Sequence, residues 1–275
     1  AAADSGKVSA TDFTPVKLIG RGAVGRVYLV KRTTGGATAA GAASGELYAV
    51  KVLTKKEMVK RNKVKRALTE REILATAKHP LIVSMYYCLT SVDRLYMVME
   101  YAAGGEFFRV MKKQPHGCLN EQQTQFYSGE VLLALEYLHM LGFIYRDLKP
   151  ENLLMHETGH IRLADFDLSK QAVASVTEAV VEKGLGLGAT KVHNVPQINT
   201  NSFVGTAEYL APEVIVGTGH DSTVDWWTVG VLVYEFLYGV TPFAAPTREQ
   251  TFANIRRGVI DFPAVPSTGA GPSGG

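Results

Sequence analysis

The sequence predicts an α+β protein in which a strand-rich first part precedes a helix-rich second part. Residues 13–100 carry several short apolar runs of the β type, interrupted by one charged helical stretch. From residue 120 onward, apolar residues recur at the three- and four-residue spacing of helices. With 275 residues, the chain is long enough to bury the core of one large domain or of two packed lobes.

Two strands of the first part are expected on either side of an insertion. Apolar runs at residues 26–30 and 46–53 predict the strands. Residues 33–45 between them are almost entirely Ala, Gly, Thr and Ser, which predicts a surface loop. A single charged helix is expected over residues 55–77.

The second part is expected to contain three helices. One covers residues 120–141, and its apolar positions are Phe126, Val131, Leu132, Leu135 and Leu138. The next covers residues 224–238 with Ser222 or Thr223 as its N-cap. A short helix is expected at residues 247–257.

Three segments are expected to lack regular structure. Residues 1–12 and 264–275 are small and polar, which predicts disorder. Residues 173–201 contain three closely spaced glycines and little periodicity, so a second surface insertion is expected there.

Composition excludes several classes of protein. The net charge of +3 gives no global argument for nucleic-acid binding. Cys88 and Cys118 lack CxxC spacing, which favours a reduced intracellular protein. His156 and His160 are four residues apart, but Thr158-Gly159 between them predicts a hairpin turn rather than a metal pair.

No membrane span is expected, because the longest apolar run, residues 229–240, contains Glu235 and is too short. No signal peptide is expected, because residues 1–10 lack an apolar core and a small-residue cleavage site. The expected location is the cytoplasm, either free or at the surface of a membrane.

Gly20, Gly22 and Gly25 form a GxGxxG run. In a dinucleotide-binding fold this run would open a helix, whereas residues 26–30 here are of the β type. The turn is therefore expected to join two strands, where glycines let backbone amides approach phosphate oxygens. On this motif alone, a purely structural hairpin is an equal alternative.

Lys51 ends the apolar run Tyr48-Ala49-Val50. A lysine at this point can bind α- and β-phosphate oxygens, and it needs a counter-ion because an unpaired buried charge is costly. Glu70 and Glu72 both lie in the following helical stretch, and their spacing does not decide between them.

The strongest signal is the run Tyr-Arg-Asp-Leu-Lys-Pro-Glu-Asn at residues 145–152. Asp147 can accept the proton of an attacking hydroxyl, and Lys149 can neutralise charge on a transferred phosphoryl group. Asn152 offers an amide oxygen to magnesium, and Asp165 offers the hard carboxylate that a hard cation prefers. A chance match to this ordered set is very improbable.

Ala211-Pro212-Glu213 and Val224-Asp225-Trp226-Trp227 complete an order of motifs that resembles protein kinases. The chain resembles the AGC group of serine/threonine kinases over about residues 13–263. The Asp165-Phe166-Asp167 triplet and the insertion that follows it are similar to the plant phototropin and fungal flippase-kinase branch. Asp167 replaces the usual glycine, and Asp tolerates unusual backbone angles better than most residues.

The resemblance implies a bilobal kinase fold. It places an antiparallel-sheet N-lobe at residues 13–100 and a helical C-lobe at residues 101–263, with the C-lobe incomplete at its end. It also implies ATP as phosphate donor, magnesium as cofactor, and Glu70 as the partner of Lys51. We expect Lys51, Asp147, Asn152 and Asp165 to surround one nucleotide.

Further nucleotide contacts are implied by the same resemblance. The residues concerned are Gly20, Gly22, Gly25, Val27, Ala49, Lys51, Met99, Glu100, Ala102 and Leu154. Met99 occupies the gatekeeper position, and the backbone groups of Glu100 and Ala102 are expected to bind the adenine edge.

The resemblance also predicts regulation. Ser202 matches the activation-loop phosphosite, which implies an upstream activating kinase. Arg146, Lys170 and Arg66 occupy the positions where the family places cations around that phosphate. For Arg66, a solvated charge among neighbouring lysines is an equal alternative.

A preference for basic substrates is implied by three carboxylates, Glu106, Glu151 and Glu235, because carboxylates accept bidentate guanidinium hydrogen bonds. Phe203 and Leu210 are expected to line an apolar pocket for the residue after the acceptor. Any of these carboxylates is also interpretable as an ordinary surface or helix-end charge.

The predicted function is therefore a serine/threonine protein kinase acting on protein substrates near basic residues. The alternative is an inactive or weakly active pseudokinase that binds nucleotide as a scaffold. The complete set Lys51, Glu70, Asp147, Asn152 and Asp165 favours the enzyme. A Rossmann-type oxidoreductase is excluded because no helix is expected after Gly25.

Overall fold

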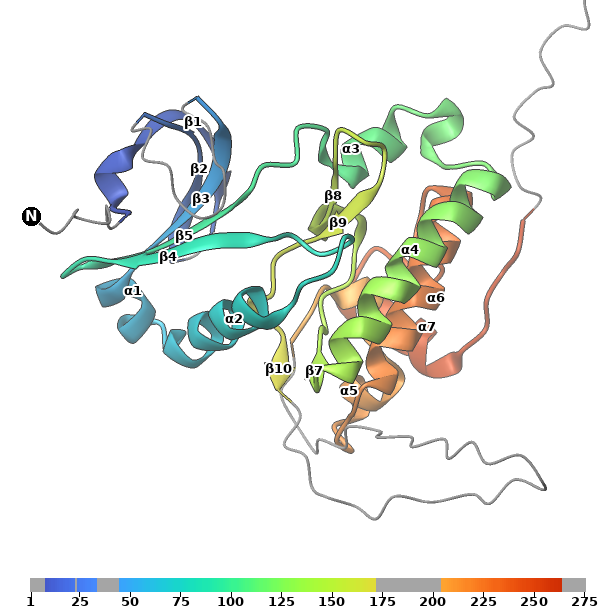
Figure 1. The fold of residues 1–275 in the computed structure, drawn as a ribbon. Helices are drawn as coiled ribbons and strands as arrows, with labels where there is room; N and C mark the ends of the chain where they lie inside the picture. The colour runs from blue at the N-terminus through green and yellow to red at the C-terminus, as the bar shows by residue number, and fades with distance from the viewer. Residues whose placement is uncertain (1–7, 23, 34–44, 172–203, 264–275) are drawn as a thin grey trace, which may run out of the picture. The chain divides into compact units, whose positions relative to one another are not determined.

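The computed structural model describes residues 8–22, 24–33, 45–171 and 204–263 (Figure 1). The chain divides into two compact units after Ala103, and each has its own architecture. Ser202, Phe203 and both predicted insertions fall wholly or mostly outside the described residues.

The first unit is built on a five-stranded antiparallel sheet with strand order β1-β2-β3-β5-β4. The strands are β1 (Phe13–Arg21), β2 (Gly25–Arg32), β3 (Leu47–Thr54), β4 (Met85–Thr90) and β5 (Arg94–Glu100). This sheet confirms the antiparallel N-lobe and the two strands predicted on either side of the first insertion.

The register of the sheet separates its two faces. Val27 lies opposite Lys51, and Lys51 lies opposite Met97 on the next strand. Residues directly opposite in antiparallel strands share a face, so Lys51 belongs to one face and its neighbours Val50 and Val52 to the other.

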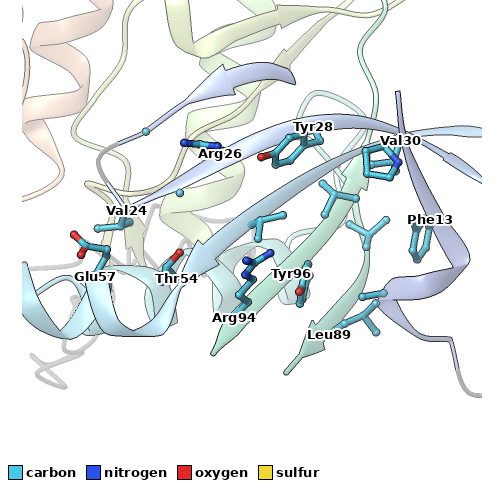
Figure 2. Close-up of a pocket in the computed structure, with 17 residues that line it drawn as sticks. Phe13, Val24, Arg26, Tyr28, Val30, Thr54, Glu57, Leu89, Arg94 and Tyr96 are labelled. Carbon is cyan, nitrogen blue, oxygen red and sulfur yellow. The ribbon is translucent and has the colours of Figure 1, made fainter. Parts of the chain in front are cut away.

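The face that carries Val50 holds the lobe's own apolar core, which also includes Phe13, Tyr48 and Val98. A cavity of about 640 Å³ opens on this side, lined by Tyr28, Tyr96 and apolar side chains of the sheet (Figure 2). Lys51 does not line this cavity, although Gly22 and Gly25 of the glycine run do.

The single helix predicted over residues 55–77 is wrong, because the structure has two: α1 (Lys55–Lys60) and α2 (Val64–Thr76). Asn62 between them adopts a left-handed backbone with φ of 52°. The Lys63 amide donates to the Met58 carbonyl, which closes a Schellman-type turn and ends α1. Asn tolerates the left-handed region better than most residues, so it marks the break.

The disorder predicted for residues 1–12 is wrong for its last part. Residues 8–12 are described and include a 3-10 helix, η1 (Ala10–Asp12). The Ser9 amide donates to the Asp12 carboxylate at 2.9 Å, and Val8 packs against the core of the sheet. These contacts tie the segment to the lobe.

The second unit is mainly helical, which confirms the predicted C-lobe. Its α-helices are α3 (Phe107–Lys112), α4 (Glu121–Met140), α5 (Pro212–Val216), α6 (Thr223–Tyr238) and α7 (Arg248–Arg257). Short 3-10 helices are η2 (Pro115–Gly117), η3 (Pro150–Asn152) and η4 (Ala207–Tyr209). Short strands form two small sheets, β6 (Gly105–Glu106) with β8 (Leu153–Met155) and β9 (Ile161–Leu163), and β7 (Phe143–Ile144) with β10 (Lys170–Gln171).

Helix α4 packs through a narrower stripe than its apolar residues suggest. Val131, Ala134, Leu135 and Leu138 are fully buried. Of the positions used to predict the helix, however, Phe126 and Leu132 are 49% and 41% exposed, because they lie off this stripe.

Helix α6 begins one residue before the predicted start, with Ser222 as N-cap. The Ser222 side chain makes no capping bond. Instead the Asp221 carboxylate accepts hydrogen bonds from both the amide and the hydroxyl of Thr223. The residue before the predicted cap therefore performs the capping.

The predicted hairpin turn between His156 and His160 is confirmed. The His156 amide donates to the His160 carbonyl at 2.9 Å, and Gly159 has a φ of 85°. Within the described residues no cluster of metal-ligating side chains occurs. In the same part of the chain, none of the helices has the length and apolar content needed to cross a membrane.

Candidate active site

The glycine run forms the turn between β1 and β2, as its β-type flanks predicted. The Gly22 amide donates to the Gly25 carbonyl at 2.9 Å. A Cβ at Gly25 would lie 2.3 Å from the Val52 carbonyl oxygen, so only glycine fits there. Because a strand follows this turn, the dinucleotide-binding alternative is excluded.

Lys51 is paired with Glu70. The Lys51 Nζ lies 2.5 Å from Glu70 Oε1, and the side chain of Glu70 is only 3% exposed. Glu70 lies on the buried side of α2, whereas Glu72 is exposed. Of the two carboxylates left open by the spacing, Glu70 therefore holds the lysine.

Three of the residues expected around the adenine, Ala49, Met99 and Glu100, lie on strands β3 and β5 of the five-stranded sheet. Ala49 precedes Lys51 on the same face of β3 and pairs with Met99 of β5. The Glu100 amide donates to the Ser84 carbonyl at 2.9 Å, so the carbonyl of Glu100 is its remaining backbone candidate for the adenine edge. Ala102 is buried. Leu154 belongs to the second unit, on β8.

In the second unit, Asp147 is held by two neighbours. The Lys149 Nζ lies 3.1 and 2.9 Å from its Oδ1 and Oδ2. The Asn152 Nδ2 donates to the Asp147 backbone carbonyl at 2.7 Å and to Oδ2 at 2.9 Å. Oδ1 carries fewer of these contacts, so it is the oxygen better placed to accept a proton.

Burial raises the pKa of the Asp147 carboxyl, while Lys149 and Asn152 oppose that rise and Asp165 adds to it. A raised pKa brings a carboxylate closer to the range in which it works as a general base. The arrangement thus suits proton acceptance from a hydroxyl.

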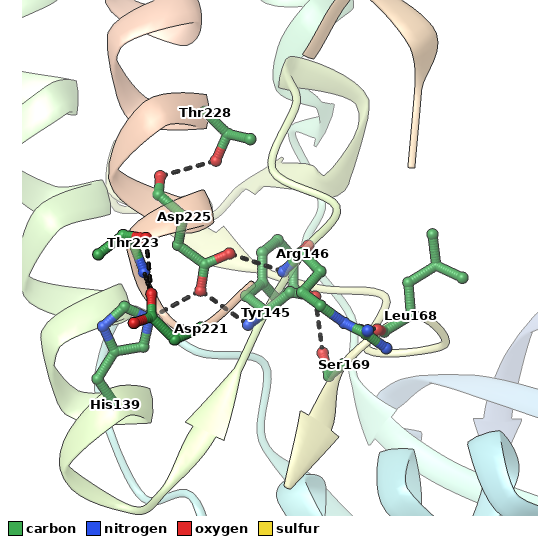
Figure 3. Close-up of polar contacts among 9 residues, drawn as sticks. All are labelled: His139, Tyr145, Arg146, Leu168, Ser169, Asp221, Thr223, Asp225 and Thr228. Carbon is green, nitrogen blue, oxygen red and sulfur yellow. Dashed lines mark hydrogen bonds and ion pairs between the residues drawn. The ribbon is translucent and has the colours of Figure 1, made fainter. Parts of the chain in front are cut away.

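The backbone of this loop is fixed by Asp225, a fully buried carboxylate near the start of α6 (Figure 3). It accepts hydrogen bonds from the amides of Tyr145 and Arg146 at 2.8 and 2.7 Å. His139 Nε2 lies 2.7 Å from the same carboxylate. These bonds hold Arg146 in a left-handed backbone with φ of 66° immediately before Asp147.

Sequence reasoning assigned no role to Asp225 or His139. A signal existed, because an aspartate inside a strongly apolar helix must have partners to be buried. What the sequence lacked was the identity of those partners, which lie about 80 residues earlier in the chain.

Asn152 and Asp165 fit the predicted magnesium site by their chemistry. Both donate oxygen, as magnesium prefers. The Asn152 amide nitrogen faces two oxygens of Asp147, which orients the amide oxygen away from them.

Asp165 has a left-handed backbone with φ of 53°, whereas Asp167 does not have a positive φ. The left-handed backbone that Asp tolerates better than most residues therefore occurs at Asp165 and not at Asp167.

Arg146 and Lys170, two of the cations predicted to receive the phosphate, lie close enough to interact electrostatically. The Arg146 Nε donates to the Leu168 carbonyl at 2.8 Å. Burial and the charge of Arg146 lower the pKa of Lys170. Burial, then Arg146 and Lys170, also lower the pKa of His220, a buried residue that sequence reasoning missed. Arg66 belongs to the first unit, and Ser202 lies outside the described residues.

The three predicted substrate carboxylates differ in environment. Glu235 is buried and accepts a hydrogen bond from the Tyr209 hydroxyl, and burial raises its pKa. Glu151 is exposed and electrostatically coupled to Glu235. Glu106 lies 3.1 Å from Arg109, in an exposed pair. The alternative interpretation of Glu235 as an ordinary surface charge therefore does not fit its buried position.

Leu210 is buried in an apolar cluster with Ile144, Ala211, Val214 and Val224. It also lines a small pocket together with Thr206 and Asp147. The Thr206 hydroxyl accepts a hydrogen bond from Lys149 at 3.2 Å. Thr206 therefore lies next to the catalytic loop, although the sequence analysis assigned it no role.

Residues 13–270 match the model of the protein kinase domain. The chain belongs to the protein kinase family. Members of this family generally use ATP and Mg²⁺ and act on protein substrates. The kinase fold implied by the motifs is therefore confirmed.

Similar proteins agree with the predicted branch. The chain is 53% identical over 266 residues to serine/threonine-protein kinase nrc-2 of Neurospora crassa, covering 94% of this chain and 41% of that protein. It is 50% identical over 257 residues to flippase kinase 1 of Saccharomyces cerevisiae, covering 93% and 28%. It is 45% identical over 258 residues to phototropin-1A of Oryza sativa subsp. japonica, covering 92% and 27%.

These relatives confirm the resemblance to the phototropin and flippase-kinase branch. The chain spans less than half the length of each of the three.

Proposed function

We propose that this kinase domain transfers the γ-phosphate of ATP to serine or threonine hydroxyls of proteins. The observation that carries the proposal is the arrangement of Lys149 and Asn152 around the Asp147 carboxylate. A partly buried carboxylate held by a cation and an amide, with a raised pKa, suits a group that orients an attacking hydroxyl.

In the proposed reaction, the substrate hydroxyl oxygen forms a bond to the γ-phosphorus as the bond to the ADP oxygen breaks. The hydroxyl proton passes to Asp147, through Oδ1. Lys149 neutralises charge on the transferred group. The leaving ADP keeps the electron pair of the broken bond.

Lys51 is proposed to bind the α- and β-phosphates, with Glu70 fixing the direction of its ammonium group. Asn152 and Asp165 would hold magnesium, which neutralises phosphate charge when bound. The β1–β2 glycine turn would cover the phosphates, because its glycines allow close approach of backbone amides.

Substrates with basic residues near the acceptor are proposed on the strength of Glu106, Glu151 and Glu235. The coupling of Glu151 to the buried Glu235 concentrates negative charge at one point, which favours an arginine over a neutral side chain. Phosphorylation of Ser202 by an upstream kinase is proposed to be received by Arg146 and Lys170. A cytoplasmic location is part of the same proposal.

The test is phosphate transfer from radiolabelled ATP to an arginine-rich serine peptide, compared between the native protein and Asp147→Asn. The asparagine keeps the size of the side chain but cannot accept a proton, so kcat is expected to fall by about 10²–10⁴-fold. A peptide with its arginines replaced by alanine is the control for substrate preference. Equal transfer by both proteins would instead favour a nucleotide-binding scaffold.

A further inference from the structure

The three-stranded sheet of the second unit ends in an edge strand, β9. Its strand order is β6-β8-β9, so β8 is paired on both sides and β9 on one. Within the described part of the chain, no strand covers the outer edge of β9. Ile161, the first residue of β9, is fully buried. A buried amide on an uncovered edge needs another acceptor, because an unpaired buried N–H is costly.

Glu130 of α4 supplies this acceptor. Its Oε2 accepts a hydrogen bond from the Ile161 amide at 2.9 Å, and its Oε1 contacts Nδ1 of His160. Helix α4 contacts β9 (Figure 1), and Glu130 is only 8% exposed. Both carboxylate oxygens are therefore engaged at the point where β9 begins.

Two further residues of α4 contact the turn that precedes β9. Phe126 and Tyr127 lie four and three residues before Glu130, so the three side chains share one side of the helix. The ring centroids of Phe126 and His160 are 5.8 Å apart. The Tyr127 hydroxyl donates to the Gly159 carbonyl at 3.5 Å. One side of α4 therefore holds the turn end of the β8–β9 hairpin.

The other end of β9 leads to Asp165, the proposed magnesium ligand. There the Ala164 amide donates to the Asn152 carbonyl at 2.9 Å. The Ala164 carbonyl accepts from the Tyr145 hydroxyl at 2.5 Å. These bonds fix one end of the strand, and Glu130 fixes the other end about 10 Å away, since a strand rises about 3.3 Å per residue. Two fixed points set the direction in which the chain reaches Asp165.

We propose that Glu130 is a positioning residue for the magnesium site, because its bond to the Ile161 amide fixes β9 and thereby Asp165. The inference rests on the proposed function, since it requires Asp165 to bind magnesium. Leu154, the predicted adenine contact of this hairpin, lies on β8, which is paired on both sides. Nucleotide contacts of β8 should therefore depend on Glu130 much less than the metal does.

The competing interpretation is a contact that only stabilises the packing of α4 on the hairpin. That interpretation predicts a loss of stability without a change in magnesium affinity. Two substitutions separate reach from charge. Glu130→Asp keeps the charge but is one methylene shorter, so it does not reach the Ile161 amide. Glu130→Gln loses the charge but keeps an oxygen at the same reach.

The test is calorimetric titration with ATP at a series of magnesium concentrations. Loss of a group that orients a metal ligand weakens metal binding about tenfold or more, so Glu130→Asp and Glu130→Ala should need about tenfold more magnesium for half-maximal ATP binding. Glu130→Gln should stay close to the native protein. ATP binding in EDTA should change little in all three, and kcat for peptide phosphorylation should return to the native value at saturating magnesium.

The matched control is Asn120→Ala, which removes the N-cap of the same helix. The Asn120 side chain accepts a hydrogen bond from the Gln123 amide at 2.8 Å, more than two turns before Glu130. This variant should lose stability but keep the native magnesium requirement. Thermal unfolding compares the stability losses of the variants. Amide hydrogen exchange at Ile161 should become faster in Glu130→Asp and stay slow in Glu130→Gln.

Three results would each overturn the proposal. They are a native magnesium requirement in Glu130→Asp, a loss in Glu130→Gln as large as that in Glu130→Asp, and an equal shift in Asn120→Ala. If Glu130→Ala does not fold, Glu130→Asp and Glu130→Gln decide the outcome. ATP binding by the native protein without any dependence on magnesium is a different result, because it would contradict the proposed function itself.

Discussion

At the scale of single residues, buried carboxylates organise both units. Glu70 directs Lys51 in the first unit, and Asp225 fixes the catalytic loop in the second. Each is almost completely buried, and each is satisfied by a cation or by backbone amides. Removing such an acceptor leaves buried donors without a hydrogen bond, and the loss in stability is larger than the net contribution of the bond itself.

Asp225→Asn is expected to lower the free energy of unfolding by about 2 kcal/mol, because an amide nitrogen replaces an oxygen that accepts from buried donors. The catalytic loop should also loosen, so kcat is expected to fall. Urea denaturation and peptide phosphorylation measure the two effects. The control is Asp261→Asn, an exposed position whose backbone carbonyl accepts from Tyr234 but whose side chain makes no hydrogen bond within the described residues. Unchanged stability of Asp225→Asn would contradict the anchoring role.

At the scale of elements, the turn between β1 and β2 shows two glycines with different constraints. A Cβ at Gly25 would collide with the Val52 carbonyl oxygen on β3. A Cβ at Gly22 would meet only the Gly25 carbonyl oxygen at 3.7 Å, an ordinary contact. One glycine is therefore required by the sheet itself, and the other is free to serve a ligand.

Gly25→Ala is expected to destabilise the protein by about 1–3 kcal/mol, since β2 and β3 must separate to admit the methyl group. Gly22→Ala should leave the melting temperature nearly unchanged while raising the KM for ATP. Thermal unfolding of the two variants side by side, together with their ATP kinetics, tests the difference. If Gly25→Ala has the same melting temperature as the native protein, the packing argument fails.

At the scale of the whole molecule, the proposed chemistry draws on both units. Lys51 and Glu70 belong to the first, and Asp147, Asn152 and Asp165 belong to the second. That these groups act on one nucleotide is still a prediction. The stabilisation of the native state by bound nucleotide tests this prediction, because every residue that contacts the nucleotide contributes to the increase in the free energy of unfolding.

Mg-ATP at a hundredfold excess over its Kd is expected to stabilise the native protein by about 2.7 kcal/mol. Both Lys51→Met and Asp165→Asn should reduce this gain, and chelation of magnesium with EDTA should reduce it in the native protein. Differential scanning calorimetry with and without Mg-ATP gives the measurement, and Lys17→Met is the control for loss of an exposed lysine. Stabilisation that survives both substitutions would show that the nucleotide binds elsewhere.

Local backbone conformation and long-range packing together account for what sequence reasoning missed. The break at Asn62 depends on one residue adopting a left-handed backbone, and the helical periodicity on either side hid it. Phe126 and Leu132 are exposed because α4 has only one packed side. The role of Asp225 was hidden because its partners lie far away in the chain.

Periodicity and the order of residue types along the chain were enough to predict the fold class, the family and the identity of the chemical groups. The folded coordinates were needed to show that Glu70 rather than Glu72 holds Lys51 and that Asp225 anchors the loop of Asp147. The physical reason is that pairing and burial depend on which side of an element meets the core, and neighbours in space are set by packing rather than by spacing along the chain.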